Sequence, residues 1–434
     1  MATRHPVEAY GSPDGRGPDA VSPDAVSPDA VPSDAVPPDA VPSDAVPAHG
    51  GVPVRTPVVV CSLETWTEVR RRIRILVDEL IDLDPSIEIL FVAPAVDVLH
   101  QLRQGDLSPL TGRGTPPRTR LEEIHPRLHV LRPRKWWPRV LGPFADRALE
   151  RQVLAAVDQL GFRRPLLWIN DASYAGLAAH TGWPTLYDIT DDWLLTPLAP
   201  RQRGRLMANE ESLMETSGAV VVCSPDLART RGSVRPVELI PNGVDVDLFR
   251  SARPRPVDLP AAPVALYVGT LHTWRIDVPL ILDLARSRPD VHVVLVGPND
   301  LPGEITDQLE AVPTIRILGA RPYDQVPAYL QHADIVIIPH LVSPFTESLD
   351  PIKAYECLAA GRPTVATPVA GFRELGPPVV TADRSTFVGA AWAALDGAGP
   401  TGVPPAPSAT PIPTWHDRAL ALASVMAHVR KTGG

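Results

Sequence analysis

From Thr56 onward, short apolar segments alternate with amphipathic ones, and this alternation constrains the fold more than any other feature. The apolar run PVVVC (57–61) predicts a buried strand, and the residues after it recur at helical spacing. That helical face comprises Trp66, Val69, Ile73, Leu76, Leu80 and Leu83. Further strands are predicted at 87–93, 128–131, 166–170, 185–189 and 219–223. Strands that alternate with helices favour a parallel sheet covered on both faces.

A second series of the same kind follows a proline-rich crossing at 240–258. Its helices are predicted at 277–288, 324–333 and from Trp415 to about Arg430. Its strands are predicted at 264–269, 291–297, 315–318, 334–339, 363–366 and 378–380. The pattern predicts two doubly wound, Rossmann-like α/β domains that face a cleft, where ligands bind at the carboxyl ends of the strands.

The expected domain limits follow from these breaks in the pattern. The first domain is 56–240 and the second is 241–413, and a final helix at 414–434 packs back on the first domain. Residues 1–55 form a tail in which 18–47 repeat a five-residue unit such as PDAVS. Frequent proline and a single valine per unit support neither a helix nor a core, so the tail is expected to be disordered.

Composition excludes several classes of protein. The chain has no apolar run of about 18 residues and no apolar segment near its start, so neither a membrane span nor a secretory signal is expected. Cys61, Cys223 and Cys357 lie far apart, which argues against a disulfide framework and a zinc site and favours the cytoplasm. The net charge of −9 argues against a nucleic-acid partner.

The segment 343–376 carries the clearest chemical pattern. Asp350 is expected to cap a helix, with Lys353 in its first turn and Glu356 three residues on, on the same face. A cation at a helix N-terminus is unfavourable unless an anion such as a diphosphate binds there. Glu356 would then accept hydrogen bonds from a ribose diol. The alternative is an internal pair between Lys353 and Glu356.

The turn after the strand at 264–269 offers a second group of candidates. Gly269 and Thr270 would let a ligand approach the backbone, and Arg275 would bind phosphate oxygens with its forked guanidinium. The alternative for Arg275 is an ion pair with Asp277 or a neighbour. His272 is interpreted as a loop histidine.

Three aspartates lie at the end of the strand at 185–189 and just beyond it, at the expected cleft edge. Asp188, Asp191 and Asp192 would bind acceptor hydroxyls, act as a base, hold Mg²⁺ or cap the next helix. Asp191 is the catalytic candidate among them. Trp66, Asp188 and Asp192 are the candidates for the acceptor side.

The string DPIKAYECLAAGRPTVATPVAGFREL resembles retaining glycosyltransferases of the GT-B fold, family-4 type. YVGTLHTWRIDVPLILDLARSRPDVHVVLVGP and PNGVDVDLF share this resemblance, while LYDITDDWL and SLETWTEVRRR resemble a subgroup of teichuronic-acid type in bacterial polysaccharide assembly. The resemblance covers about 56–430.

The resemblance implies roles for individual residues. Arg275 and Lys353 match the residues that hold the donor diphosphate, and Glu356 matches the ribose ligand. Many members carry a further glutamate that would fall at Ser348, whereas here the acid is one place earlier, at Glu347. The family also implies retention of configuration, without a dedicated protein base.

The residues and the resemblance together predict a glycosyltransferase that uses a nucleotide-diphosphate sugar and a hydroxyl acceptor, with no cofactor and no metal. The leaving diphosphate would be stabilised by Arg275 and Lys353. A sugar-nucleotide epimerase, a phosphorylase or a catalytically silent partner subunit of the same fold are the alternatives. The basic and tryptophan-rich stretch 132–141 predicts contact with a membrane surface that carries a lipid-linked acceptor, or else an exposed loop.

Overall fold

The computed structural model describes residues 55–67, 70–97, 120–135, 143–261, 263–399, 401–402 and 411–433. The predicted tail therefore lies outside the described residues, except for Arg55. The predicted membrane contact at 132–141 also lies outside them from residue 136 onward.

The first sheet has the strand order β10-β9-β8-β7-β1-β2-β5-β4. Its neighbouring strands are parallel except for β4 and β5, which run antiparallel at one edge. The expectation of a purely parallel sheet is wrong there, because only two residues separate the two strands and so short a connection can join only antiparallel neighbours. The bounds are β1 (Thr56–Cys61), β2 (Ile87–Val92), β4 (Arg120–His125), β5 (Leu128–Arg132), β7 (Leu166–Ile169), β8 (Thr185–Ile189), β9 (Ala219–Val222) and β10 (Glu238–Leu239).

The second sheet has the order β13-β12-β11-β14-β15-β16, and its strands are parallel. Every strand predicted for this half of the chain is present, with ends that differ by one residue. The bounds are β11 (Val264–Val268), β12 (His292–Val296), β13 (Ile315–Gly319), β14 (Ile335–Ile338), β15 (Thr364–Ala366) and β16 (Val379–Thr381). A short pair, β3 (Val96–Asp97) and β6 (Arg134–Lys135), lies apart from both sheets. The predicted fold class, with two Rossmann-like parallel sheets, is confirmed.

Alternate residues of β1 face opposite layers of helices. Val58 and Val60 belong to a core shared with α1 (Arg72–Leu83) and α15 (Trp415–Thr432). Val59 and Cys61 belong to a core shared with α4 (Pro143–Gln159), α5 (Ala175–Thr181) and α6 (Pro200–Thr216). This period of two is what a strand buried on both faces requires.

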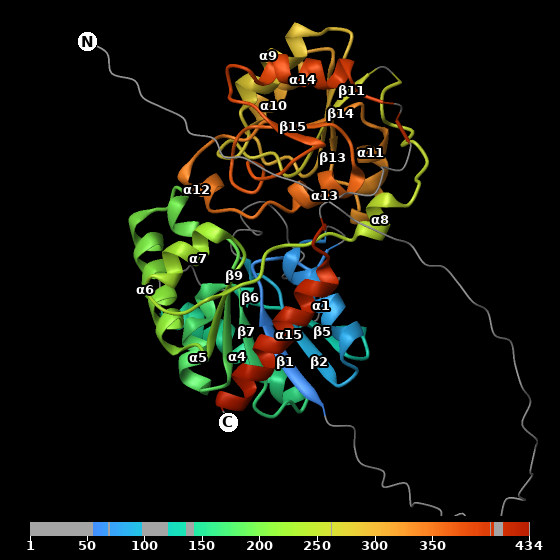
Figure 1. Cartoon of the computed structure of the whole chain (residues 1–434). Coiled ribbons are helices and arrows are strands. Elements are labelled where there is room, and N and C mark those ends of the chain that lie inside the picture. Colours follow the sequence, from blue (N-terminus) through green and yellow to red (C-terminus); the bar gives the residue numbers. More distant parts are fainter. Residues whose placement is uncertain are drawn as a thin grey trace, which may run out of the picture. The chain divides into compact units, whose positions relative to one another are not determined.

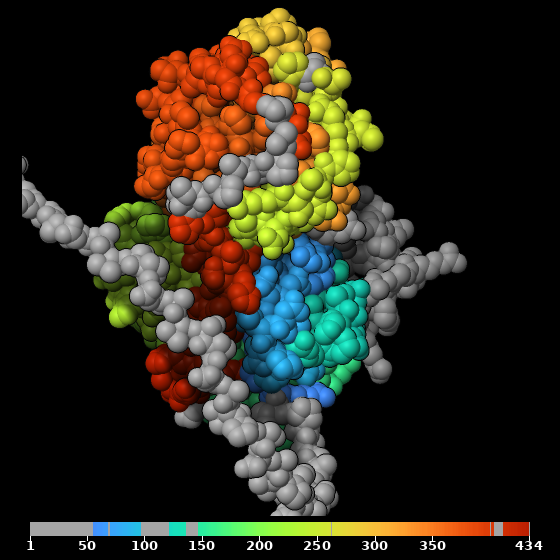
Figure 2. Space-filling model, turned by 45° about the vertical axis from the view of Figure 1, so that its right-hand side comes forward, coloured from blue at the N-terminus to red at the C-terminus, as the bar shows by residue number. Residues whose placement is uncertain are grey.

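The last helix of the chain completes the first layer. Figure 1 shows α15, in red, beside α1 against the sheet that contains β1 and β2. In the space-filling view the red surface of α15 adjoins the blue surface of the first elements (Figure 2). Trp415, Leu422 and Met426 are buried in this contact, so residues distant in sequence build one core.

The helices that pack on the second sheet are also amphipathic. In α9 (Val278–Ser287), the buried residues include Leu280, Ile281 and Leu284, three and four apart. The other helices of this half are α10 (Gly303–Glu310), α11 (Val326–His332), α13 (Ile352–Ala360) and α14 (Phe387–Asp396). The remaining helices of the described residues are α7 (Pro225–Gly232), α8 (Val246–Arg250) and α12 (Pro344–Glu347). The 3₁₀ turns described are η2 (Ala172–Tyr174), η3 (Trp193–Leu195) and η4 (Tyr323–Gln325).

The helix predicted to include Trp66 begins later. Trp66 lies in a bend before α1, whose first residue is Arg72. The indole is nevertheless buried, with its ring 5.0 Å from that of Phe91 on β2. Its apolar spacing therefore reflects burial from a loop and not a continuous helix.

In the part of the chain that the structure describes, no helix has both the length and the apolar character needed to span a bilayer. All three cysteines are buried and unpaired.

Candidate active site

A cavity of about 420 Å³ lies at the carboxyl ends of strands from both sheets. Its walls come from the residues that follow β1, β7 and β8 in the first sheet and β11, β12 and β14 in the second. In each sheet the strand order reverses here, because β1 lies between β7 and β2 and β11 lies between β12 and β14. Ligands of open α/β sheets bind at such switch points.

Two glycines bring bare backbone to the cavity at the ends of β11 and β12. A Cβ atom on Gly297 would lie 2.0 Å from the carbonyl oxygen of Gly269, so no larger residue fits there without a shift of the backbone. The Gly269 N–H donates to Val296 O at 2.8 Å, which fixes the two turns side by side. Gly269 and Thr270 line the cavity, where the sequence predicts a close ligand approach.

Arg275 reaches the same cavity from the turn before α9. Its guanidinium carbon lies 5.2 Å from the centre of the Trp274 ring, and its Nε is buried without a hydrogen-bond partner. The alternative of an ion pair with Asp277 is wrong. The Asp277 carboxylate caps α9 through the Leu280 N–H at 3.0 Å and pairs with Arg384 at 2.6 Å.

Lys353 and Glu356 form the internal pair that the sequence left as an alternative. Lys353 Nζ donates to Glu356 Oε2 at 2.9 Å across the first turn of α13. Both residues line the cavity, where Glu356 is almost fully buried and the lysine side chain is 30% exposed. The exposed part of the ammonium leaves it able to contact a ligand as well as its partner.

Arg275 and Lys353 act on a common neighbour. Both cations oppose protonation of His340, a buried residue at the end of β14. Burial is the largest cause and these two positive charges add to it, so the pKa of His340 falls to about 3. The imidazole is therefore neutral near pH 7, and the positive charge in this part of the cavity belongs to Arg275 and Lys353.

Asp350 does not cap α13, contrary to the prediction. Its Oδ2 accepts the N–H of Asn242 at 2.5 Å and its Oδ1 accepts the Tyr355 hydroxyl at 2.8 Å. The residue before α13 is Pro351, which provides no side-chain cap. Asp350 lines the cavity but is nearly buried, and these bonds tie the helix to the crossing between the two sheets.

Of the three aspartates in and after β8, the structure brings only Asp191 to the cavity. Its Oδ2 accepts the Thr190 hydroxyl at 3.2 Å. Burial raises the pKa of the Asp191 carboxyl, while the positive charge of Arg275 opposes that rise. Asp191 and Arg275 thus both line this cavity, from segments that follow strands of different sheets.

The three acceptor-side candidates are buried and do not line the cavity, contrary to the prediction. Asp188 is fully buried in β8, 3.1 Å from the Trp168 Nε1 and 3.6 Å from the Arg72 guanidinium. Asp192 turns the other way and pairs with Arg231 at 3.1 Å. Trp66 packs on Phe91 and has Arg74 over its ring at 4.5 Å. Each side chain is occupied by a structural contact.

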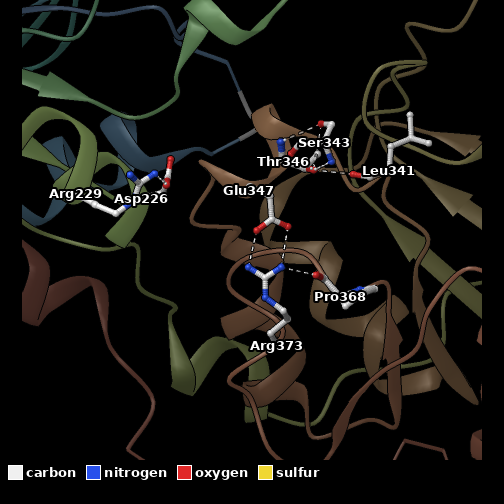
Figure 3. Close-up of polar contacts among 8 residues, drawn as sticks. All are labelled: Asp226, Arg229, Leu341, Ser343, Thr346, Glu347, Pro368 and Arg373. Carbon is white, nitrogen blue, oxygen red and sulfur yellow. Dashed lines mark hydrogen bonds and ion pairs between the residues drawn. The ribbon is translucent and has the colours of Figure 1, made fainter.

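Glu347, the acid one residue before the position at which many family members have a glutamate, also makes a structural contact. Figure 3 shows its carboxylate facing the Arg373 guanidinium, with contacts of 2.9 and 2.5 Å. Ser348, at the family position itself, is buried and donates its hydroxyl to Phe345 O at 2.7 Å. Neither residue lines the cavity.

Sequence reasoning missed Glu64, in the loop after β1. Its carboxylate lines the cavity and accepts the N–H groups of Ile73 and Arg74 at 3.2 and 3.3 Å, so it caps α1 from eight residues before the helix begins. Burial raises the pKa of Glu64 to about 7, against the lowering effect of Arg71 and Arg72. The sequence signal that could have identified Glu64 was its position as an acid in the loop just after the first predicted strand, 57–61.

Sequence reasoning also missed two tryptophans, Trp193 and Trp274, that line the cavity from different sheets. Trp193 follows the aspartates directly, and Trp274 precedes Arg275. Large aromatic residues beside candidate polar residues, just after predicted strands, were the signal.

Comparison with known proteins confirms the resemblance seen in the sequence. Residues 262–391 match the family model described as glycosyl transferases group 1. A Bacillus subtilis (strain 168) protein, TuaH, named as a candidate teichuronic acid biosynthesis glycosyltransferase, is 26% identical over 238 residues. The match covers 50% of this chain and 59% of TuaH, so it spans little more than half of that relative.

Solved structures share the fold over most of the chain. HepE from Anabaena, in complex with UDP-glucose, is 16% identical with a TM-score of 0.54, and the match covers 87% of this chain and 98% of HepE. The catalytic domain of starch synthase IV from Arabidopsis thaliana, bound to ADP and acarbose, is 11% identical with a TM-score of 0.57, covering 87% and 99%. These likenesses establish the GT-B fold.

Proposed function

We propose that this chain, with its group 1 glycosyl transferase match over 262–391, is a glycosyltransferase that moves a sugar from a nucleotide-diphosphate sugar to a hydroxyl acceptor. The observation that carries the proposal is the convergence of Arg275 and Lys353 on one cavity, which the backbone of Gly269 and Gly297 also lines. The two cations come from segments far apart in sequence, and after burial their charges further lower the pKa of His340, which stays neutral near pH 7.

The arrangement suits the departure of a diphosphate. When the anomeric C–O bond breaks, negative charge develops on the diphosphate oxygens. Arg275 and Lys353 stabilise that charge more strongly in the transition state than in the bound donor, which is the condition for catalysis. Glu356, beside Lys353, accepts hydrogen bonds from the donor ribose in this proposal.

The finer parts of the proposal rest on the family resemblance. Transfer proceeds with retention of configuration and without a divalent metal, and the donor carries a nucleoside such as the uridine of the HepE complex. The acceptor is a growing glycan, by analogy with the polysaccharide pathway in the name of TuaH. A lipid-linked acceptor and membrane contact at 132–141 remain predictions.

A screen of nucleotide sugars by thermal shift, followed by transfer assays with the radiolabelled donor that binds, tests the proposal. A ligand at 100 times its dissociation constant adds about 2.7 kcal/mol of stability, enough to raise the melting temperature measurably. Release of free nucleoside diphosphate together with a glycosylated acceptor supports a transferase. Release of nucleoside diphosphate that depends on inorganic phosphate supports a phosphorylase. Binding of a nucleotide sugar without any turnover of it supports a catalytically silent subunit. Product NMR then reports the anomeric configuration, and EDTA treatment tests the metal-free expectation.

A further inference from the structure

An aromatic wall joins the two halves of the chain at one side of the cavity. It consists of Trp193 in η3, Phe345 in α12, Trp274 after β11 and His272 beside it. The ring centres of Trp193 and Phe345 are 6.1 Å apart, those of Phe345 and Trp274 are 4.9 Å apart, and His272 stacks on Trp274 at 4.7 Å.

The members of this aromatic wall are buried to different degrees. Phe345 is 4% exposed and lies behind the two tryptophans as their common support. Trp193, Trp274 and His272 are partly exposed and line the cavity. Partly exposed indoles in a cavity otherwise rich in charged groups suit a ligand that has an apolar face and polar edges.

A carboxylate stands beside the wall. Asp191 lines the cavity two residues before Trp193, whereas Asp192 between them turns away to Arg231. The segment 191–193 therefore presents an acid and an indole to the same space. A pyranose ring has this combination of needs, because its C–H groups form an apolar face and its hydroxyls donate at the rim.

The wall ends at the cation assigned to the leaving group. The Arg275 guanidinium lies over the face of Trp274, and its charge acts on Asp191. A sugar ring on the wall would thus lie next to the place where the proposed transfer occurs, on the side of the cavity to which the first sheet contributes. The nucleotide side, with Gly297 and Glu356, belongs to the second sheet.

We infer that the aromatic wall is the acceptor subsite: the terminal pyranose of the acceptor stacks on Trp193, and one of its hydroxyls donates to Asp191. The assignment of the bound sugar as the acceptor rests on the proposed function. The binding of a sugar ring to Trp193 can be measured without any transfer.

The first experiment measures binding of the full chain to an array of pyranose-terminated oligosaccharides, in the absence of nucleotide sugar. Wild-type protein binds a subset of them, and Trp193→Ala weakens that binding roughly tenfold, the scale of a single aromatic contact. Trp193→Phe keeps a smaller ring and restores part of the affinity. It also keeps the experiment decisive if the alanine variant unfolds.

Trp392→Ala is the matched control. Trp392 in α14 is partly exposed like Trp193, but it lies outside the cavity. Arg288 lies 5.5 Å from the centre of the Trp392 ring, and the indole Nε1 donates to Ser287 Oγ at 2.8 Å. Its loss should leave glycan binding unchanged. Trp274 is a poorer test, because its removal would also release Arg275.

The second experiment separates this inference from the proposed function. With the donor found in the thermal-shift screen, Trp193→Ala raises the acceptor KM while the dissociation constant of the donor stays at the wild-type value. Weaker nucleotide binding with an unchanged acceptor KM would overturn the inference and assign the wall to the nucleobase. Absence of glycan binding by the wild type would overturn the inference as well. So would variants Trp193→Ala and Trp193→Phe that bind glycans as tightly as the wild type. A wild-type protein that binds glycans through Trp193 but no nucleotide sugar would instead refute the proposed function.

Discussion

The ammonium of Lys353 lies 2.9 Å from the Glu356 carboxylate, one turn along α13, and the two side chains differ sharply in exposure. Both side chains line the cavity, but Glu356 is 1% exposed and Lys353 is 30% exposed, so the ammonium is the more accessible group of the pair. A lysine in the first turn opposes the helix dipole, and Glu356 offsets part of that cost. The pair therefore holds a cation at a helix end where an anionic ligand would complete its environment.

Lys353→Ala should reduce turnover by on the order of 10²–10³, by analogy with the loss of one oxyanion donor. It should affect donor binding less, because the charge on the leaving group grows in the transition state. Lys353→Arg should rescue poorly, since a planar fork does not fill the place of a compact ammonium. Steady-state kinetics with radiolabelled donor measure both. Near-normal turnover with only a lower melting temperature would mean that Lys353 is purely a partner for Glu356.

Arg275→Ala should produce a loss of similar size. The double variant with Lys353→Ala should lose less than the product of the two single losses, because both cations act on the same leaving group and their effects are coupled. The same kinetic assay gives the turnover of the wild type, the two single variants and the double variant, which together form a double-mutant cycle. Losses that multiply fully would show that the two cations act on separate groups.

Glu347→Ala should leave turnover unchanged and cost at most about 1 kcal/mol of stability. Its contact with Arg373 is a surface pair, with side chains 30% and 43% exposed, and such pairs contribute little. Arg373→Ala is the matched variant from the other side of the pair. A large fall in turnover for Glu347→Ala alone would instead assign it the sugar contact that many relatives make one position later.

Glu64 should make stability depend on pH. Its pKa rises from 4.5 to about 7 in the folded chain, chiefly through burial, so the folded state binds this proton more tightly than the unfolded state. The protonated carboxyl therefore contributes to the free energy of unfolding at low pH, and this contribution is lost as the pH rises from about 4.5 through 7.

Glu64→Gln should remove that component. The difference in melting temperature between the wild type and the variant, measured from pH 5 to pH 8, should shift in favour of the variant as the pH rises. Taking the difference cancels the groups that titrate in both proteins. Parallel curves would show that Glu64 has an ordinary pKa.

The fold was largely predictable because it depends on local patterns. Apolar runs such as 264–269 and helical spacing such as that in 277–288 reflect burial of one short element, and each appears in the structure within a residue of its predicted end. The hairpin of β4 and β5 was not predicted, because β4 has the sequence RLEEIH and carries charged side chains at the sheet edge.

The candidate site was predictable only in part, because a sequence pattern does not give the direction of a side chain. Asp188, Asp191 and Asp192 have the same chemistry and adjoining positions. The alternation of side chains and the turn after β8 bury Asp188 against Arg72, bring Asp191 to the cavity and direct Asp192 to Arg231. Likewise, the Asp-Pro pattern at 350–351 suggested a cap, but the long-range contact with Asn242 occupies that carboxylate.

The sequence by itself determined the two parallel sheets, the crossing between them and the residues Gly269, Arg275, Lys353 and Glu356, because each follows from spacing within a short segment or from a motif. Tertiary structure alone decided which acids reach the cavity, where Glu64 lies and how Trp193, Phe345 and Trp274 meet. Those contacts join residues from separate elements, and their partners are fixed only when both sheets have formed and their ends come together.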